Sequence, residues 1–157
     1  MIKENQMKKK LVCIFITIII FFSILVVINY FHSPSYKLNK YANITHHMLK
    51  DITYEEKKET SFLGDGIDIV SYKIKDNNIE DIINKNKNWL IIDKDFNKTL
   101  KELTYQLPKE GYYLIYDLKT KEYTTFTNMY KETKSRDYLL IILDSQNNEL
   151  VYLEYHS

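Results

Sequence analysis

Two carboxylates beside a tight turn are the residues of this chain with the most direct link to chemistry. Asp65 lies between Gly64 and Gly66, and Asp68 follows closely in sequence. Two neighbouring carboxyl groups suit general acid and base catalysis, since one can hold a proton while the other accepts one. No histidine or cysteine lies near them in sequence as an obvious partner. A small envelope hydrolase that uses Asp65 and Asp68 is therefore one hypothesis for this protein.

Two further groups have the chemistry of metal ligands, but neither forms a complete site. His46 and His47 are neighbours, so on a helix their side chains point about 100° apart and do not share one ion. Asp93, Asp95 and Asn97 match the first three ligands of a calcium loop. The glycine and the closing glutamate of such a loop are missing from their positions, and Asp95 is better explained as a helix cap. We therefore expect no metal or other cofactor.

Tyrosine is frequent in this chain, with 14 residues that all lie at position 30 or later. Its large ring with a polar tip suits surfaces that bind sugars or proteins, although many tyrosines of a sheet pack against their neighbours. Five tyrosines of the predicted strands form a candidate recognition face: Tyr112, Tyr116, Tyr123, Tyr138 and Tyr152. With Asp65 and Asp68 they are the candidate binding residues.

One uninterrupted apolar stretch determines where these residues act. Residues 11–28 read LVCIFITIIIFFSILVVI and contain no charge. As a helix they extend about 27 Å, close to the hydrocarbon thickness of a bilayer. We predict a cytoplasmic arm at 1–10 and a transmembrane signal anchor at 11–31 that contacts the lipid bilayer. Lysines at 8, 9 and 10 precede the span, which predicts a cytoplasmic N-terminus and a C-terminal domain outside the cell membrane.

A cleaved signal peptide has the same order of basic and apolar residues. The apolar run is longer than the usual length of about 7–15 residues, and no A-x-A cleavage site follows it. We prefer the uncleaved anchor and leave cleavage open. The span also lacks the Gly-x-x-x-Gly pattern that lets helices approach closely, so lateral association in the bilayer is a weaker hypothesis.

The remainder of the chain is predicted to be a short tether at 32–37 and one extracytoplasmic domain at 38–157. The domain is long enough to bury one core. Its net charge is about −2, which gives no electrostatic reason to expect a nucleic acid as partner. It contains no cysteine, so its stability must come from burial.

Hydrophobic periodicity predicts an α+β fold, in which helices pack on one face of an antiparallel sheet. Apolar residues three and four positions apart predict a helix over 38–51. The charged stretch 53–60 fits either a strand or a continuation of that helix. Further helices are predicted over 76–85, where Asp76 can serve as the cap, and over 95–107.

The last third of the chain predicts a C-terminal antiparallel meander, which follows one earlier strand. The predicted strands are 67–74, 112–118, 123–127, 138–143 and 150–155. The run at 138–143 is apolar without alternation, which suits a central strand covered on both faces. Alternation in the last strand predicts that Val151, Leu153 and Tyr155 face inward.

Several short motifs follow one another along the second half of the chain: Phe62-Leu63-Gly64-Asp65-Gly66, Trp89, Leu107-Pro108, Gly111-Tyr112-Tyr113 and the ending from Asp144 to Tyr155. In the order of these motifs the chain resembles a group of small, largely uncharacterised secreted or membrane-anchored proteins of low-GC Gram-positive bacteria. Members of the group tend to carry a histidine before the Gly-Asp-Gly and an Asp-Arg-His after the Gly-Tyr-Tyr strand. This chain has Leu63 and Asp117-Leu118-Lys119 there. The resemblance implies no known activity and supports only the anchored domain.

These features predict a non-enzymatic domain, anchored in the membrane, that binds an envelope protein or a cell-wall ligand outside the cell. An immunity-type protein or an accessory subunit of an envelope complex fits this description. The envelope hydrolase is the alternative from a different class.

Overall fold

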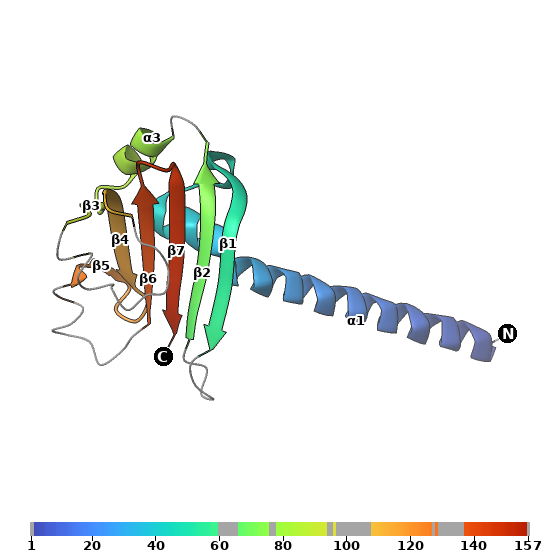
Figure 1. Cartoon of the computed structure of the whole chain (residues 1–157). Helices are drawn as coiled ribbons and strands as arrows, with labels where there is room; N and C mark the ends of the chain where they lie inside the picture. Colours follow the sequence, from blue (N-terminus) through green and yellow to red (C-terminus); the bar gives the residue numbers. More distant parts are fainter. Residues whose placement is uncertain are drawn as a thin grey trace. The chain divides into compact units, whose positions relative to one another are not determined.

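The computed structural model of the chain describes residues 2–59, 66–75, 78–93, 96, 108–126, 128 and 137–156. The chain divides into two compact units, Met1–Lys37 and Leu38–Ser157. In the first unit, helix α1 covers Ile2–His32 (Figure 1). Its segment Val12–His32 is, in the part of the chain that the structure describes, the one helix long and apolar enough to cross a membrane. It is compatible with a single-pass anchor and with a signal peptide.

The two hydroxyl side chains within residues 11–28 are satisfied inside α1. The Thr17 hydroxyl donates a hydrogen bond to the Cys13 carbonyl at 2.9 Å, and the Ser23 hydroxyl donates to the Ile19 carbonyl at 2.8 Å. Such bonds to the preceding turn remove the need for an external polar partner. Neither hydroxyl therefore opposes burial of this helix in lipid.

Helix α2 covers Pro34–Ala42, so residues predicted as a tether form its first turn. The prediction of one helix over 38–51 is wrong beyond residue 42. Asn43 adopts a positive φ of 58°, a conformation that ends helices, and the Ile44 N–H donates to the Leu38 carbonyl at 3.2 Å. The apolar spacing in the sequence reflects burial and not one continuous helix. Ala42, Ile44, Met48 and Leu49 are all buried in the core, although they come from a helix, a turn and a strand.

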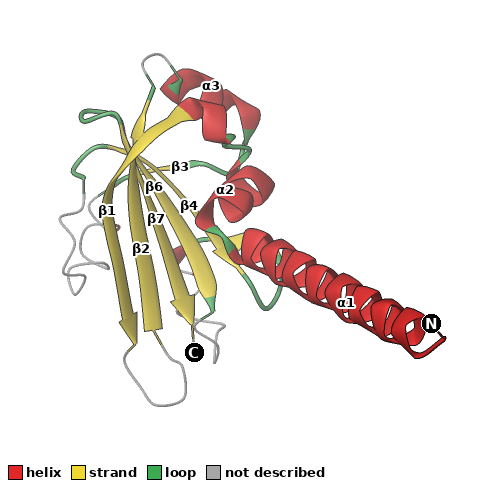
Figure 2. Cartoon of the chain, turned by 90° about the vertical axis from the view of Figure 1, so that its right-hand side faces the viewer, coloured by secondary structure: helices red, strands yellow, loops and turns green. Residues whose placement is uncertain are grey.

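A short 3-10 helix, η1 (His46–Met48), leads into a seven-stranded antiparallel sheet in the described part of the second unit. Its strand order is β1-β2-β7-β6-β4-β3, and β5 also pairs with β4. The strands are β1 (Leu49–Glu59), β2 (Gly66–Ile74), β3 (Leu90–Ile91), β4 (Gly111–Asp117), β5 (Glu122–Thr124), β6 (Tyr138–Asp144) and β7 (Glu149–His156). Helix α3 (Ile79–Lys85) lies at the end of the sheet opposite the C-terminus (Figures 1 and 2).

The antiparallel sheet is confirmed, and the order of the predicted meander needs one correction. Both predicted hairpins form, since β4 pairs with β5 and β6 pairs with β7. However, β6 pairs with β4 and not with β5. Strand β5 covers the other edge of β4, together with β3. The open choice for 53–60 is also resolved, because this charged stretch belongs to the edge strand β1 as far as Glu59.

Both faces of the sheet carry a buried apolar cluster, and the central strands β6 and β7 supply alternate residues to each. On one face, Leu139, Ile141 and Tyr152 pack with residues from α2, α3 and Trp89. On the other face, Leu140 and Leu153 pack with a group that includes Ile92, Phe96 and Phe126. The prediction that 138–143 is a central strand covered on both faces is confirmed.

Several predictions fall partly or wholly outside the described residues. The helix over 95–107 is described only at Phe96, whose N–H donates to the Asp93 carboxylate at 2.8 Å. The caps Asp95 and Asp76 lie outside the described residues, and so does the turn at 64–65. The helix predicted over 76–85 is present as α3 from Ile79.

Candidate functional site

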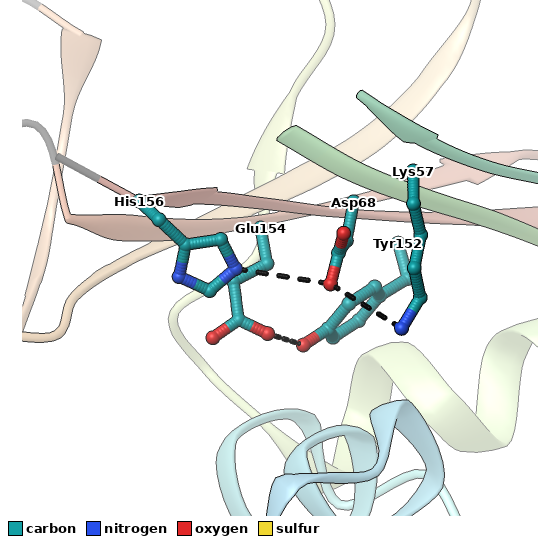
Figure 3. A network of polar contacts seen from close by, with 5 residues as sticks. All are labelled: Lys57, Asp68, Tyr152, Glu154 and His156. Carbon is teal, nitrogen blue, oxygen red and sulfur yellow. Dashed lines mark hydrogen bonds and ion pairs between the residues drawn. The ribbon is translucent and has the colours of Figure 1, made fainter. Parts of the chain in front are cut away.

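A row of charged side chains crosses three neighbouring strands near the C-terminal end of β7. Lys57 of β1 pairs with Asp68 of β2, and Asp68 pairs with Glu154 of β7. Residues that pair directly across an antiparallel sheet share a face, and so do residues two apart on one strand. Tyr152 and His156 therefore lie on the face that carries Glu154. We call Lys57, Asp68, Tyr152, Glu154 and His156 the sheet-end cluster (Figure 3).

Asp68 is the centre of the charged contacts. Its Oδ2 lies 4.0 Å from Lys57 Nζ and 3.8 Å from His156 Nε2. The side chains are 69% exposed for Lys57, 31% for Asp68 and 42% for His156. Exposed ion pairs at such distances contribute little to stability, because water and salt screen them. These three groups are accessible to a ligand.

The other half of the cluster is buried. Tyr152 is 0% exposed and Glu154 is 4% exposed, and the Tyr152 hydroxyl donates a short hydrogen bond to Glu154 Oε2. Burial raises the pKa of the Tyr152 phenol well above its usual range, and the negative charge of Glu154 and the hydrogen bond to it act in the same direction. At neutral pH the Tyr152 phenol is therefore protonated and acts as a hydrogen-bond donor, not as a base or a nucleophile.

The chemistry open to this arrangement follows from its exposed half. A carboxylate with an imidazole and an ammonium group beside it can hold a polar ligand or transfer a proton. The separation of 3.8 Å between Asp68 and His156 is longer than a hydrogen bond, so this carboxylate does not orient the imidazole directly. This geometry allows polar contact with a ligand but does not align Asp68 and His156 as a catalytic pair.

Two of the five candidate tyrosines meet at a second place. Tyr116 of β4 pairs with Tyr123 of β5, and their ring centroids are 5.2 Å apart. The Tyr116 ring also lies 4.2 Å from that of Tyr41, and the Tyr123 hydroxyl donates to the Tyr41 carbonyl at 2.6 Å. Tyr123 is 39% exposed. We call Tyr41, Tyr116 and Tyr123 the tyrosine cluster.

The remaining candidate tyrosines lie elsewhere, so the five do not form one face. Tyr112 packs on the same side of the sheet as the tyrosine cluster. Tyr138 lies on the opposite side, where it stacks on Tyr155 at 4.3 Å. Tyr152 is fully buried in the sheet-end cluster. Of the two acidic candidates, Asp68 joins the sheet-end cluster, and Asp65 lies outside the described residues.

Of the residues considered as metal ligands in the sequence, the structure describes His46, His47 and Asp93, whereas Asp95 and Asn97 lie outside the described residues. His46 and His47 are exposed on η1, and the Asp93 carboxylate accepts the Phe96 N–H. Among the described residues, no three histidine, cysteine, aspartate or glutamate side chains come together in a group that could hold a metal ion.

Sequence reasoning missed Lys57, Glu154 and His156. The available signal was the position of Glu154 in the run Leu150-Val151-Tyr152-Leu153-Glu154, where every neighbour is apolar or aromatic. Val151, Leu153 and Tyr155 were predicted to face inward, and they do, but the other face of β7 is buried as well. A glutamate on a buried face needs a polar partner, which points to Tyr152.

Comparisons of the chain with protein family models, with curated proteins and with solved structures return no match.

Proposed function

We propose that this protein is a single-pass membrane protein whose residues 38–157 form an extracytoplasmic domain that binds an envelope protein or a cell-wall ligand. In this proposal the lipid bilayer contacts residues 11–31, and helices cover one face of the sheet. The domain acts as an immunity-type protein or as an accessory subunit of an envelope complex. The resemblance to small anchored proteins of low-GC Gram-positive bacteria agrees with this assignment.

The observation that carries the proposal is the exposure of the apolar helix. The segment Val12–His32 is 0% buried within the structure, and its side chains include Phe15, Phe21 and Phe22 at 58% or more exposed. Soluble proteins rarely expose contiguous apolar patches beyond a few hundred square ångströms. A bilayer covers such a helix on all sides, and the lysines before it favour a cytoplasmic N-terminus.

The tyrosine cluster is the recognition surface in this proposal. Tyr123 combines an exposed ring with a position on the short strand β5, and its ring packs against that of Tyr116, which in turn packs against that of Tyr41. Rigid aromatic rings at a sheet edge provide contact area at a small entropic cost.

A crosslinking pull-down from intact membranes tests the binding role. Full-length protein is compared with Tyr123→Ala and with the control Ile91→Ala, a residue 71% exposed on β3 at the same edge of β4. We expect a specific partner that the control retains and that Tyr123→Ala loses about tenfold or more, as loss of an aromatic hot spot does. Equal recovery with both variants would contradict a role for the tyrosine cluster.

One observation favours the envelope hydrolase as a second candidate function. Asp68 has Glu154 directly across from it and His156 at 3.8 Å, so two carboxylates and an imidazole share one end of the sheet. Release of soluble fragments from purified cell-wall material by the wild type, lost in Asp68→Asn but not in the control Lys73→Gln at the other end of β2, would establish the hydrolase. The binding proposal predicts no release by any of the three proteins.

A further inference from the structure

The junction between α1 and α2 turns the chain at one serine. The Ser33 hydroxyl donates to the Tyr30 carbonyl at 2.7 Å, which caps the end of α1. The same oxygen accepts the Tyr36 N–H at 3.3 Å, which caps the start of α2. Pro34 is the first residue of α2, a position where its missing N–H has no cost. The local sequence Ser33-Pro34 therefore favours a break between the two helices.

Three aromatic rings meet at this junction. The Tyr36 ring centroid lies 5.4 Å from that of Tyr30 and 4.9 Å from that of Phe31, and the Tyr30 and Phe31 rings are 5.8 Å apart. All three pairs have edge-to-face geometry, which is favourable for aromatic rings. We call Tyr30, Phe31 and Tyr36 the junction triad.

The triad exists only because the helix breaks. In a continuous α-helix, Tyr36 would lie about 7.5 Å beyond Phe31 along the axis and point about 140° away from it. Instead, the two ring centroids lie 4.9 Å apart, in contact. Sequence position alone would place Tyr36 farther into the water phase.

The length of the apolar segment fixes the level of the triad relative to a bilayer. A helix with the 21 residues of Val12–His32 extends about 31 Å, which matches a hydrocarbon core of about 30 Å. Tyr30 and Phe31 then lie at its outer boundary, where their rings are 57% and 49% exposed. Tyrosine is enriched at this boundary, because its ring is apolar and its hydroxyl is polar.

We infer that the junction triad is an interfacial anchor that binds among the phospholipid headgroups and holds Tyr36 at the depth of Phe31. This inference depends on the proposed membrane span and adds a defined depth and a defined set of lipid-contacting residues. The anchor fixes the vertical position of α1 and keeps the first turn of α2 at the membrane surface.

Fluorescence quenching in phosphatidylcholine vesicles tests the inference on the full-length protein. The background is Trp89→Phe, which removes no hydrogen bond in the described structure, because Trp89 Nε1 has no partner there. Single tryptophans are introduced as Ile16→Trp, Phe31→Trp and Tyr36→Trp. Lipids brominated near the headgroup or deep in the acyl chain report depth, and acrylamide reports contact with water. Circular dichroism of each variant verifies the helix and sheet content.

We expect the fluorescence of tryptophan at 36 and at 31 to be quenched to the same extent, and most strongly by the bromines near the headgroup. Tryptophan at 16 should be quenched most strongly by the bromines deep in the acyl chain. Adding Ser33→Ala and Pro34→Ala should let the helix continue, so that tryptophan at 36 loses most of its lipid quenching and gains acrylamide quenching. If tryptophan at 36 is quenched by acrylamide and not by lipid, while tryptophan at 31 is quenched by lipid, the interfacial anchor is contradicted and the membrane span still holds. Absence of lipid quenching at 16 would overturn the span itself.

Discussion

Gly111→Ala should destabilise the second unit by about 2–5 kcal/mol, the largest effect we expect from a single methyl group. Gly111 has a φ of +143°, which side chains rarely tolerate, and a Cβ there would lie 2.0 Å from the Leu143 carbonyl oxygen. That oxygen belongs to β6, directly beside the start of β4. Alanine must therefore push two central strands apart. The fraction unfolded is measured by urea denaturation of the full-length protein in detergent, with Trp89 fluorescence as the signal.

Lys109→Ala is the matched control, since Lys109 is exposed just before the same strand. Exposed substitutions of this kind usually change stability by less than about 0.5 kcal/mol. Because domains are typically stable by only about 5–15 kcal/mol, Gly111→Ala should unfold at much lower urea concentration than the control. Equal midpoints for the two variants would show that β4 does not begin as described.

Tyr152→Phe should destabilise the domain by about 1–3 kcal/mol, because it leaves the buried Glu154 carboxylate without the phenol that donates to it. The two rings occupy nearly the same volume, so the loss reports the hydrogen bond and not packing. The same urea experiment measures it.

A double-mutant cycle separates this bond from general effects at the site. Glu154→Leu alone leaves the Tyr152 hydroxyl without its acceptor, whereas Tyr152→Phe with Glu154→Leu removes both polar groups of the hydrogen bond. We expect the double variant to be more stable than the sum of the two single changes predicts, by about 1 kcal/mol or more. Strict additivity would mean that the two side chains do not interact.

The stabilising effect of Tyr152 should also disappear in alkali. Burial raises the pKa of Tyr152 above its usual value of about 10, so above that pH the unfolded chain releases a proton that the folded chain retains. Stability from this residue is present below pH 10 and falls by about 1.4 kcal/mol per pH unit above it. The difference in unfolding free energy between the wild type and Tyr152→Phe should therefore shrink above pH 10. Tyr113 and Tyr116 are common to both proteins and cancel in the comparison.

Strands with a strong pattern could be predicted from the sequence because their residue types are sufficient. Ile67 to Ile74 and Tyr138 to Leu143 are rich in β-branched and aliphatic residues, and both form strands. The helix over 38–51 failed because apolar spacing reports which residues are buried and not the backbone that buries them. Asn43 was the local signal for the helix end.

Strand order and the sheet-end cluster required long-range information. The sequence shows that β4 and β5 form a hairpin, but it does not show which edge of β4 accepts β6. Asp68 was recognised as a candidate from its turn, whereas Lys57 and Glu154 reach it only through the pairing of β1, β2 and β7. Residues this far apart in the sequence come together only through the order of the strands in the sheet, which composition and periodicity do not predict.

The orientation of single cysteines across the membrane tests the central claim most directly. In a Cys13→Ser background, Asn5→Cys marks the N-terminal arm and Ser145→Cys marks an exposed turn between β6 and β7. An impermeant maleimide is applied to intact cells that express the full chain. The anchored-domain proposal predicts labelling at 145 in intact cells, labelling at 5 only after permeabilisation, and full-length protein in carbonate-washed membranes. Protection of 145 in intact cells, or a shortened protein released into the medium, would contradict it.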